Sequence, residues 1–332
     1  MKPKIAIDLG TSYTKIYKAQ ADVVLIEPTC IAIKNKNYKK PFACGQDAYS
    51  LIGKTPDNVK VIFPINNTEI IDNRALVSLL NYFVSRVKKP FERVKDVLLS
   101  VQCGTNRETI KKFENALIGA KLYNVCYAEN PMLAVLGSSE ELSSEKPNGV
   151  IDLGGAQTTV CVLTELGVIS GALAEFGGND LTKMIIKHIE DSLHLSITPY
   201  TAESLKIQLS SLDQDDQTKM VISGKDTLNG KQKTIPISAE QIYVPVKEYV
   251  DKIVKVANAI LSSLHSDILS QLAKTGIHLT GGGVKIYGIS DYLSQALSIK
   301  TIVSEEAEIA SIIGAGKLVE NKELLDKLKL QV

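Results

Sequence analysis

The sequence predicts an α/β fold made of two similarly built domains, and three observations support this prediction. Strand-like and helix-like segments alternate along the chain, which is the pattern of α/β domains. An apolar-Asp-Leu-Gly motif occurs at Asp8 and again at Asp152, 144 residues later (152 minus 8), which is close to half of the chain. The length of 332 residues corresponds to about two domains at roughly 150 residues each.

The first half of the chain opens on a strand-turn-strand unit. Residues 5–7 and 15–17 are strand-like and flank a turn with the sequence DLGTS at 8–12. The further elements expected in this half are apolar strand-like runs at 23–26 and 31–33 separated by Glu27 and Pro28, a helix at 76–87 that is stopped by Pro90, a buried strand at 97–101 and a helix at 107–117.

The second half repeats this opening. Residues 149–155 read GVIDLGG, and residues 158–163 form the strand-like segment that matches 15–17. Helical periodicity follows at 180–193 and at 246–264, and the polar segment 214–230 between these helices suggests a small inserted subdomain. The chain then continues with a strand at 277–279, a glycine turn at 281–283 and C-terminal helices.

Charge and composition exclude several functional classes. Lys plus Arg number 38 and Asp plus Glu number 37, so the formal net charge is only +1. A dedicated nucleic-acid binder usually has a clear basic excess, and single-strand binders need aromatic stacking platforms. Aromatic residues make up only 5% of the chain and Trp is absent. No direct nucleic-acid binding is therefore expected.

The cysteines and the N-terminal sequence predict a cytoplasmic protein. Five scattered cysteines without a C-x-x-C pair argue against a disulfide framework or a zinc knuckle, and are expected to be buried thiols in a reducing compartment. The N-terminus contains no apolar stretch of signal-peptide length. No window approaches the ~18 apolar residues of a membrane span.

The two repeated turns have the chemistry of phosphate binding. Glycine lets backbone N–H groups approach an anion closely, and the hydroxyls of Thr11, Ser12 and Thr14 add donors. An aspartate at the end of the preceding strand, Asp8 or Asp152, can hold a hydrated magnesium ion. Two such turns that face each other across a cleft would hold the phosphates of a nucleotide from both sides. Two ordinary hairpin turns remain the alternative, but they do not explain the matched spacing.

A third glycine motif, LTGGGV at 279–284, follows a strand and would let an adenine or ribose lie against the backbone. Two familiar motifs are absent. The segment 53–55 resembles the end of a P-loop, but Ala48 occupies the place of the required first glycine. The segment 281–288 does not match the Rossmann fingerprint because Ile286 stands at a required glycine. The histidines form no ligand-spaced cluster; they are His188, His194, His265 and His278.

Together these motifs resemble the actin-like ATPase superfamily. Residues 8–14 (DLGTSYT) and 152–155 (DLGG) look like its two phosphate motifs, and residues 279–283 (LTGGG) look like its adenosine motif. Within the superfamily the chain is most similar to bacterial actins of the MreB and MamK type. The supporting segments are 26–29, 45–48, 52–56, 129–132 and 201–206, whereas 178–182 (GNDLT) is nearer to actin and FtsA. The resemblance covers nearly the whole chain.

The resemblance implies an actin-like ATPase fold, in which two duplicated α/β domains form four subdomains around a nucleotide cleft. Domain I is expected at 1–145, with a small subdomain at about 33–65. Domain II is expected at 146–332, with a small subdomain at about 181–238, and the helices at about 312–332 return to domain I. The length leaves no room for the separate peptide-binding domain of a chaperone.

The resemblance also implies a nucleotide site for ATP or ADP with Mg²⁺. Asp8 and Asp152 are the expected metal-binding residues. The expected nucleotide-binding residues come from the glycine motifs, the segment before the helix at 180–193, and the helix that in the family faces the nucleoside. They are Gly10, Thr11, Ser12, Tyr13, Thr14, Gly154, Gly155, Ala156, Gln157, Gly177, Gly178, Glu203, Lys206, Gly281, Gly282 and Gly283.

The expected catalytic residues are Asn130, Glu129, Gln157 and Asp152, and two of them depart from the family pattern. Asn130 stands where MreB-like proteins usually have a catalytic Glu, with Glu129 one residue earlier, and Gln157 stands where the second phosphate turn usually has its first Thr. Neither carboxamide can take a proton as a base, but both can orient a water molecule. The sequence therefore predicts slow ATP hydrolysis.

By this resemblance the protein is a cytoskeletal filament protein. Its main partner would be itself, in a homopolymer of paired protofilaments, since head-to-tail contacts build open filaments. The cellular role is left open between cell shape, organelle or magnetosome positioning, and DNA segregation. The alternative is a non-filamentous ATP switch of chaperone or reactivase type. A small-molecule kinase ranks third, because no catalytic Asp base can be assigned.

Accessory or membrane-associated partners are also left open. Two segments are candidates for direct membrane contact, namely Phe91 after Pro90 and the short amphipathic tail at 324–330. A helix packed on its own domain is the alternative interpretation of the tail. The expected location is thus the cytoplasmic cytoskeleton, with membrane association undecided.

Overall fold

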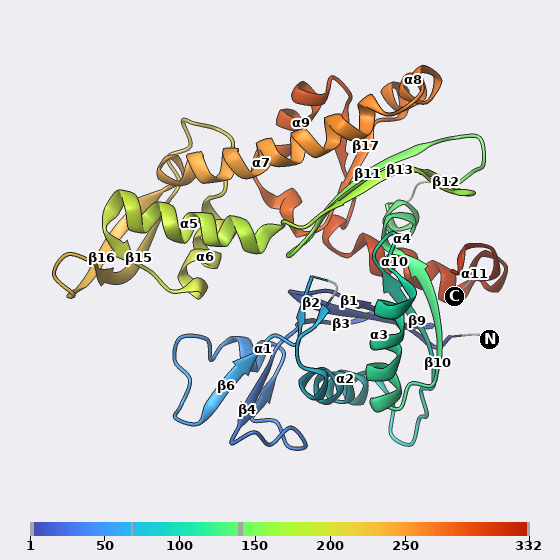
Figure 1. Cartoon of the computed structure of the whole chain (residues 1–332), viewed down its shortest axis with the longest axis horizontal. Helices are drawn as coiled ribbons and strands as arrows, with labels where there is room; N and C mark the ends of the chain where they lie inside the picture. Colours follow the sequence, from blue (N-terminus) through green and yellow to red (C-terminus); the bar gives the residue numbers. More distant parts are fainter. Residues whose placement is uncertain (1–2, 68, 139–141, 331–332) are drawn as a thin grey trace. The chain divides into compact units, whose positions relative to one another are not determined.

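The computed structural model describes residues 3–67, 69–138 and 142–330, and the chain divides into two compact units (Figure 1). Unit 1 comprises residues 1–145, 163–167 and 308–332, and unit 2 comprises residues 146–162 and 168–307. Each unit is built on one five-stranded mixed sheet.

The unit 1 sheet has the strand order β10-β9-β1-β2-β3. The antiparallel strands β1, β2 and β3 are one continuous meander, whereas β9 and β10 run parallel to β1. The strands are β1 (Ile5–Leu9), β2 (Tyr13–Lys18), β3 (Asp22–Pro28), β9 (Asp96–Val101) and β10 (Asn124–Glu129).

Helices cover both faces of this sheet (Figure 1). The helices α2 (Asn73–Val87) and α3 (Arg107–Gly119) share one core cluster with the side chains of Ile5, Val97 and other alternate strand residues. The helix α10 (Ala310–Glu320) contacts β1, β2, β3 and β9 and lies across α4 (Asn130–Gly137). Because side chains alternate along a strand, one face of β1 and β9 packs against α2 and α3, and the other face packs against α10.

Unit 1 also carries smaller elements and the C-terminal helix. The smaller elements are β4 (Ile31–Lys34), β5 (Ala43–Cys44), α1 (Gln46–Tyr49), β6 (Val59–Ile62) and the pair β7 (Ile65–Asn66) and β8 (Glu69–Ile70). The strands β5, β4 and β6 form a three-stranded sheet. The C-terminal helix is α11 (Lys322–Leu328).

The unit 2 sheet repeats the topology of the unit 1 sheet. Its order is β13-β12-β11-β17-β18, which matches β3-β2-β1-β9-β10 strand for strand. As in unit 1, the strand that carries the Asp-Leu-Gly motif pairs with a parallel neighbour on one side. The strands are β11 (Asn148–Leu153), β12 (Thr158–Thr164), β13 (Gly167–Ala174), β17 (Ile277–Thr280) and β18 (Thr301–Val303).

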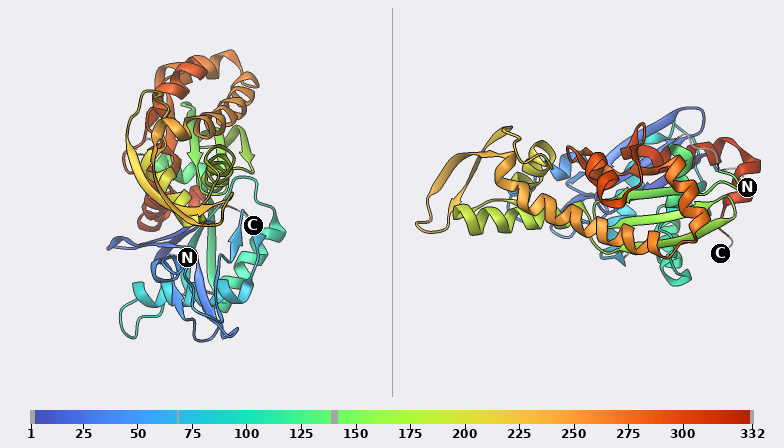
Figure 2. Two further views of the ribbon diagram at one scale, coloured as in Figure 1. Left: turned by 90° about the vertical axis from the view of Figure 1, so that its left-hand side faces the viewer. Right: turned by 90° about the horizontal axis from the view of Figure 1, so that it is seen from above.

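Most of the remaining elements of unit 2 are helices, and α5 and α7 share one hydrophobic cluster with β11. A three-stranded sheet of β14, β15 and β16 extends past the ends of these helices (Figure 2). The elements are α5 (Gly178–Leu193), β14 (Leu195–Ser196), α6 (Pro199–Leu209), β15 (Lys219–Asp226), β16 (Gln232–Ser238), α7 (Ala239–Ser262), α8 (Ser266–Thr275), the 3-10 helix η1 (Gly282–Lys285), α9 (Ile289–Leu297) and the 3-10 helix η2 (Ala307–Ile309), whose last residues belong to unit 1.

Two sequence-based boundaries are wrong. The two runs form separate strands as predicted, but the first does not end at Ile26: Glu27 and Pro28 are the last residues of β3, because β3 is an edge strand and the N–H that proline lacks is not needed there. The helix expected from residue 246 begins at Ala239, before Pro245. Ser238 forms a capping box with Gln241, and this local stabilisation lets the helix begin ahead of the proline.

The polar segment 214–230 contains β15 and a tight turn, so it forms part of a hairpin. The glycine segment 281–283 starts the 3-10 helix η1 where only a turn was expected.

The two segments proposed for membrane contact differ in exposure. The tail forms α11, whose Leu325 and Leu328 are buried against unit 1, so its apolar side is covered. The N–H of Leu330 donates to the carbonyl oxygen of Tyr127, 2.8 Å away. Phe91 is fully exposed. Within the described ranges, no helix has both the length and the apolar content that are needed to cross a bilayer.

The described cysteines are all free thiols. Cys30, Cys44 and Cys161 are buried, as the sequence predicts, whereas Cys103 and Cys126 are partly exposed. Burial raises the pKa of Cys30 and of Cys44 to about 12, so both remain protonated and unreactive at neutral pH.

The contact between α4 and α10 depends on glycine and gives a first prediction. A Cβ atom on Gly314 would overlap the carbonyl oxygen of Leu133, and one on Gly137 would overlap that of Ala310. We expect Gly314→Ala to lower the stability of unit 1 by about 1–3 kcal/mol or more, because overpacking forces the helices apart. Thermal unfolding followed by circular dichroism measures this effect. The exposed α3 substitution Lys111→Ala is the control, and equal melting temperatures for the two variants would contradict the prediction.

Candidate functional site

The first glycine turn connects β1 to β2 in unit 1. The N–H of Gly10 donates to the carbonyl oxygen of Tyr13 at 3.1 Å, and a Cβ on Gly10 would lie only 2.7 Å from that oxygen. The hydroxyl of Thr29 donates to the carbonyl oxygen of Gly10 at 2.7 Å and lies 2.9 Å from the buried hydroxyl of Thr14. The turn therefore needs glycine at position 10 and is fixed from behind by two threonines.

The second turn connects β11 to β12 in unit 2 and has the same construction. The N–H of Gly154 donates to the carbonyl oxygen of Gln157 at 3.0 Å, and a Cβ on Gly154 would lie 2.8 Å from that oxygen. The hydroxyl of the buried Thr158 donates to the carbonyl oxygen of Phe176 at 3.0 Å. The sequence repeat is thus a repeat of backbone conformation as well.

The strand-end aspartates are held in the same way in both units. The hydroxyl of Ser100 on β9 donates to Oδ1 of Asp8 at 2.9 Å. The hydroxyl of Thr280 on β17 donates to Oδ1 of Asp152 at 2.9 Å. In each unit a hydroxyl on the adjacent parallel strand therefore fixes the carboxylate at the carboxyl edge of the sheet.

Lys15 distinguishes the two copies. It pairs with Asp8 across β1 and β2, and its Nζ lies 3.1 Å from Oδ2 of Asp8. The two side chains are only 19% and 9% exposed. The equivalent residue of the second copy is Thr159. Lys15 is not among the site residues expected from sequence. The sequence does contain a signal for it, because a hairpin around the turn at 9–14 places residue 15 opposite Asp8.

The second turn lies against the start of α5. The N–H of Gly178 donates to the carbonyl oxygen of Gly154 at 3.0 Å, and that of Asn179 donates to the carbonyl oxygen of Gly155 at 2.7 Å. A Cβ on Gly177 would lie 2.7 Å from three backbone atoms of the turn. The turn thus adjoins the N-terminus of a 16-residue helix, where the helix dipole favours an anion.

Glu203 and Lys206 on α6 connect to this helix start. Nζ of Lys206 lies 2.7 Å from Oε2 of Glu203 and donates to the carbonyl oxygen of Gly178 at 3.1 Å. The same Glu203 oxygen accepts from the hydroxyl of Thr182 at 2.6 Å. The pair therefore orders the α6 surface next to the second turn.

The third glycine motif lies against the end of β11. Gly281 has a φ of +82°, and a Cβ there would come 2.5 Å from the carbonyl oxygen of Leu153. A Cβ on Gly283 would lie 2.6 Å from the Cβ of Leu153. In unit 2 the structure thus brings together most of the residues expected from sequence, namely Asp152, Gly154, Gly155, Ala156, Gln157, Gly177, Gly178, Glu203, Lys206, Gly281, Gly282 and Gly283.

In unit 1 the expected residues fall at two places on the carboxyl edge of the sheet. Thr11 and Ser12 lie in the first turn and Tyr13 begins β2; the hydroxyl of Thr11 donates to the carbonyl oxygen of Asn67 at 3.3 Å. Glu129 and Asn130 lie where β10 passes into α4. Asn130 is 8% exposed.

The two adjacent residues Glu129 and Asn130 differ in their hydrogen bonding. Oε1 of Glu129 accepts from the N–H of Gly104 at 3.2 Å. Oδ1 of Asn130 is buried and has no hydrogen-bond partner among the described residues.

A hydrated magnesium ion fits the strand-end aspartates better than a metal ion caged by protein ligands. No group of three or more His, Cys, Asp or Glu side chains in the described ranges could form a protein cage for a metal. Magnesium keeps several waters and needs only one or two carboxylates together with phosphate oxygens. Oδ2 of Asp8 already lies 3.1 Å from the ammonium of Lys15, which competes with a cation. A strand-end carboxylate of this kind at Asp152 fits a hydrated ion.

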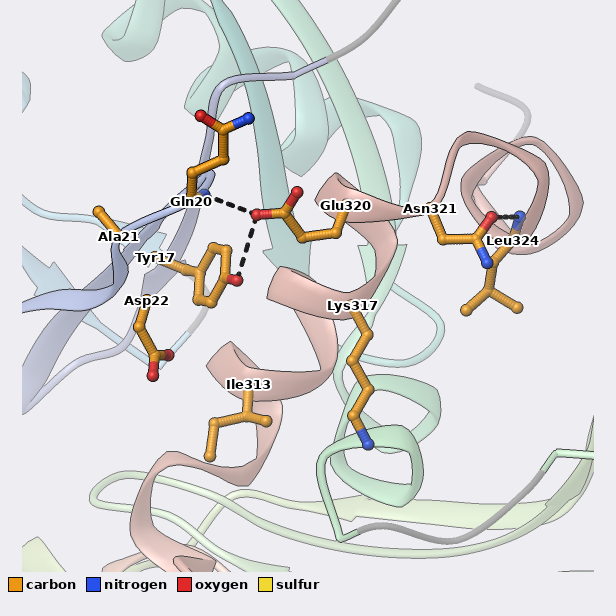
Figure 3. Close-up of a pocket in the computed structure, with 9 residues that line it drawn as sticks. All are labelled: Tyr17, Gln20, Ala21, Asp22, Ile313, Lys317, Glu320, Asn321 and Leu324. Atoms are coloured by element: carbon orange, nitrogen blue, oxygen red, sulfur yellow. Dashed lines mark hydrogen bonds between the residues drawn. The ribbon is translucent and has the colours of Figure 1, made fainter.

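A separate hollow lies at the other end of β2 in unit 1 (Figure 3). It has a volume of about 880 Å³ and is lined by the nine residues labelled in the figure, none of them expected from sequence as a site residue. Oε1 of Glu320 accepts from the N–H of Gln20 at 2.7 Å and from the hydroxyl of Tyr17 at 3.4 Å. Burial and the carboxylate of Glu320 raise the pKa of Tyr17. These bonds tie the β2–β3 turn to α10.

Comparisons with known proteins agree on one group of relatives. The family model described as MreB/Mbl protein matches residues 2–327. The cell shape-determining protein Mbl of Bacillus subtilis is 27% identical over 331 residues, which cover 98% of each chain. The cell shape-determining protein MreB of Escherichia coli K12 is 27% identical over 322 residues, which cover 95% of this chain and 93% of that protein.

Solved structures give the same result. The crystal structure of MreB 5 of Spiroplasma citri bound to AMPPNP has a TM-score of 0.91 and 25% sequence identity, and the match covers 98% of each chain. A second structure of that protein, bound to ADP, matches equally well. A MamK double helical filament structure matches with a TM-score of 0.80 at 15% identity over 96% of this chain and 98% of that chain, which supports the fold alone.

The ion pair of the partly buried Lys15 with the buried Asp8 gives a second prediction. Lys15→Met leaves the carboxylate of Asp8 buried without its cation, so we expect the free energy of unfolding to fall by about 1–3 kcal/mol. The double variant Lys15→Met with Asp8→Asn should recover part of this loss. Urea unfolding without nucleotide measures both. The exposed Lys183, paired with Asp180, provides the control Lys183→Met, and a loss no larger than in that control would refute the prediction.

Proposed function

The chain belongs to the MreB/Mbl protein family, and from this premise we propose that it is a bacterial actin that binds ATP, hydrolyses it slowly and polymerises. Its fold is the duplicated actin-like α/β fold that the sequence predicts. One observation supports the proposal most directly. The turns at Gly10 and Gly154 have the same glycine-dependent hydrogen bond, and each follows an aspartate held by a hydroxyl of the next strand.

We propose that the phosphates of the nucleotide bind to these two turns. Backbone N–H groups in glycine turns attract anions, and the start of α5 adds a positive dipole to the second turn. In the first turn, Lys15 supplies a cation next to Asp8. The structures of MreB 5 bound to AMPPNP and ADP support an adenine nucleotide as the ligand. The nucleoside would then contact Glu203, Lys206 and the glycines 281–283.

In this proposal Asp152 holds the hydrated Mg²⁺, with Asp8 as the second expected metal residue. When bound, the ion neutralises charge on phosphate oxygens. The chain itself fixes the rotamer of Asp152 through Thr280, so the carboxylate is ordered before any ligand arrives. The two compact units correspond in this proposal to two actin-like domains, with small subdomains at about 33–65 and 181–238.

Hydrolysis is proposed to be slow because the residues that face the reaction are carboxamides. Asn130 and Gln157 can accept a hydrogen bond from water but cannot take its proton. Oε1 of Glu129 already accepts a hydrogen bond from the N–H of Gly104, which holds this carboxylate against the loop between β9 and α3. Positioning supplies much of the catalysis of phosphoryl transfer, so a low rate remains possible without a general base.

Filaments are the proposed assembly, with paired protofilaments as the arrangement. Head-to-tail contacts between identical copies build open polymers. The relatives named as cell shape-determining proteins support a cytoskeletal role for such a polymer. A role in cell shape is therefore proposed first, ahead of organelle positioning and DNA segregation, for a cytoplasmic cytoskeletal protein with accessory partners.

Nucleotide-dependent polymerisation gives a third prediction. We expect the protein to pellet in ultracentrifugation with ATP and to remain largely in the supernatant with ADP or without nucleotide. ADP at one hundred times its Kd should stabilise the fold by about 2.7 kcal/mol. Gly177→Ala should abolish both effects, because its Cβ displaces the second turn, whereas the exposed control Lys183→Ala should not. A chain that binds ADP but stays monomeric with ATP would favour the non-filamentous switch.

The place of Asn130 gives a fourth prediction. Asn130→Ala removes the buried acceptor proposed to orient the attacking water, so phosphate release should slow by about tenfold or more. ADP binding should remain within about twofold of the wild type, because the substitution leaves both turns intact. A phosphate assay and a titration with fluorescent ADP measure the two quantities, and unchanged phosphate release would exclude the assigned role.

A further inference from the structure

Gln102 lies beside Asn130 at the carboxyl edge of the unit 1 sheet. In the parallel ladder of β9 and β10, Val101 pairs with Glu129, and both strands end there. Gln102 and Asn130 are the next residues along the two strands. Adjacent parallel strands are about 4.8 Å apart, so these two residues leave the sheet side by side.

The register places both residues on the face that carries the aspartate. Side chains alternate along a strand, and continuing this alternation by one residue past the ends of β9 and β10 puts Gln102 on the side of Ser100 and Asn130 on the side of Ala128. The hydroxyl of Ser100 donates to Asp8, whose other oxygen pairs with Lys15. The intervening Val101 belongs to the cluster on the opposite face, which α2 covers. A row of polar groups therefore runs from Lys15 and Asp8 through Ser100 to Gln102 and Asn130.

The carboxamide oxygens of Gln102 and Asn130 both lack a hydrogen-bond donor among the described residues. Oε1 of Gln102 and Oδ1 of Asn130 are each buried and have no hydrogen-bond partner among the described residues. An unsatisfied buried acceptor costs about 1–3 kcal/mol, so two neighbouring ones need a specific reason. A purely structural pair would bond to itself, with the NH₂ group of one carboxamide donating to the oxygen of the other, and these oxygens accept no such bond.

A water molecule is the ligand that fits these two acceptors. It donates two hydrogen bonds from one oxygen, so a single molecule can satisfy both acceptors. An anion is excluded as the direct ligand of the two oxygens, since it offers no donor.

We infer that Gln102 is a second catalytic residue, which holds the attacking water jointly with Asn130; this inference rests on the proposed ATP hydrolysis. As the water oxygen bonds to the γ-phosphorus, the bond from phosphorus to the bridging oxygen breaks and ADP leaves with the electron pair. The proton of the water passes to a phosphate oxygen or to solvent, because neither carboxamide can take it. The products are ADP and phosphate.

The test compares Gln102→Leu, which keeps the volume but removes the acceptor, with the exposed control Gln271→Leu on α8. Phosphate release at saturating ATP should fall by about tenfold in Gln102→Leu, while the Kd for fluorescent ADP stays within about twofold. The double variant Gln102→Leu with Asn130→Leu should lose little more than either single variant, because residues that hold one water act as a unit.

Gln102→Glu adds a readout that a structural role would not change. The substitution is nearly isosteric and supplies a base, so phosphate release should gain a pH dependence in which it falls as the carboxylate becomes protonated at low pH. The wild type has no such base on these two residues. Because the variant keeps the shape of Gln102, it also tests the inference if Gln102→Leu fails to fold.

The outcomes separate the inference from the function on which it rests. A wild-type chain that does not bind ADP overturns both. A wild-type chain that binds ADP but releases no phosphate overturns the inference and leaves nucleotide binding standing. Normal phosphate release in Gln102→Leu, or a pH profile of Gln102→Glu identical to that of the wild type, overturns the inference alone.

Discussion

The hydrogen bond from a hydroxyl to a strand-end aspartate is the constraint on which each half of the molecule depends. Ser100 holds Asp8, and Thr280 holds Asp152, each from the adjacent parallel strand. Each bond requires the parallel strand to end in register with the aspartate strand. It therefore links the sheet topology to the glycine turn that follows, so the backbone N–H groups of that turn stand next to an ordered carboxylate.

Glycine makes the rest of the unit 2 site compact. Gly177 and Gly281 let α5 and the third motif approach the end of β11 to distances at which any side chain would collide. The same requirement at Gly137 and Gly314 joins α4 to α10 in unit 1. Close backbone packing at these glycines therefore orders the segments that surround each turn. Because this packing depends on the backbone, other side chains near the turns can differ in chemistry between the two copies.

Those differences carry the proposed mechanism. The first copy has Lys15 where the second has Thr159, so the cation beside the first turn comes from the following strand, whereas the cation beside the second turn is Lys206 on α6. Gln102 and Asn130 have buried carboxamide oxygens at the carboxyl edge of the unit 1 sheet. A carboxylate in place of either carboxamide would act as a base. The duplicated fold thus provides two similar turns, and we propose that charge neutralisation and water positioning depend on the side chains that differ around them.

The sequence by itself determined the duplication, the glycine turns and the strand-end aspartates, because each depends on a local backbone geometry that only certain residues allow. It also indicated Asn130 and Gln157 as departures from the family pattern. The tertiary structure decided several further features: Lys15 pairs with Asp8, β3 ends at Pro28, α7 starts ahead of Pro245, and Gln102 follows the strand next to the one that leads into Asn130. The register of β9 against β10 joins residues that are far apart in the chain, and no local pattern encodes it. The hairpin pair of Lys15 with Asp8 and the capping box of Ser238 with Gln241 are local patterns, which the sequence could have indicated.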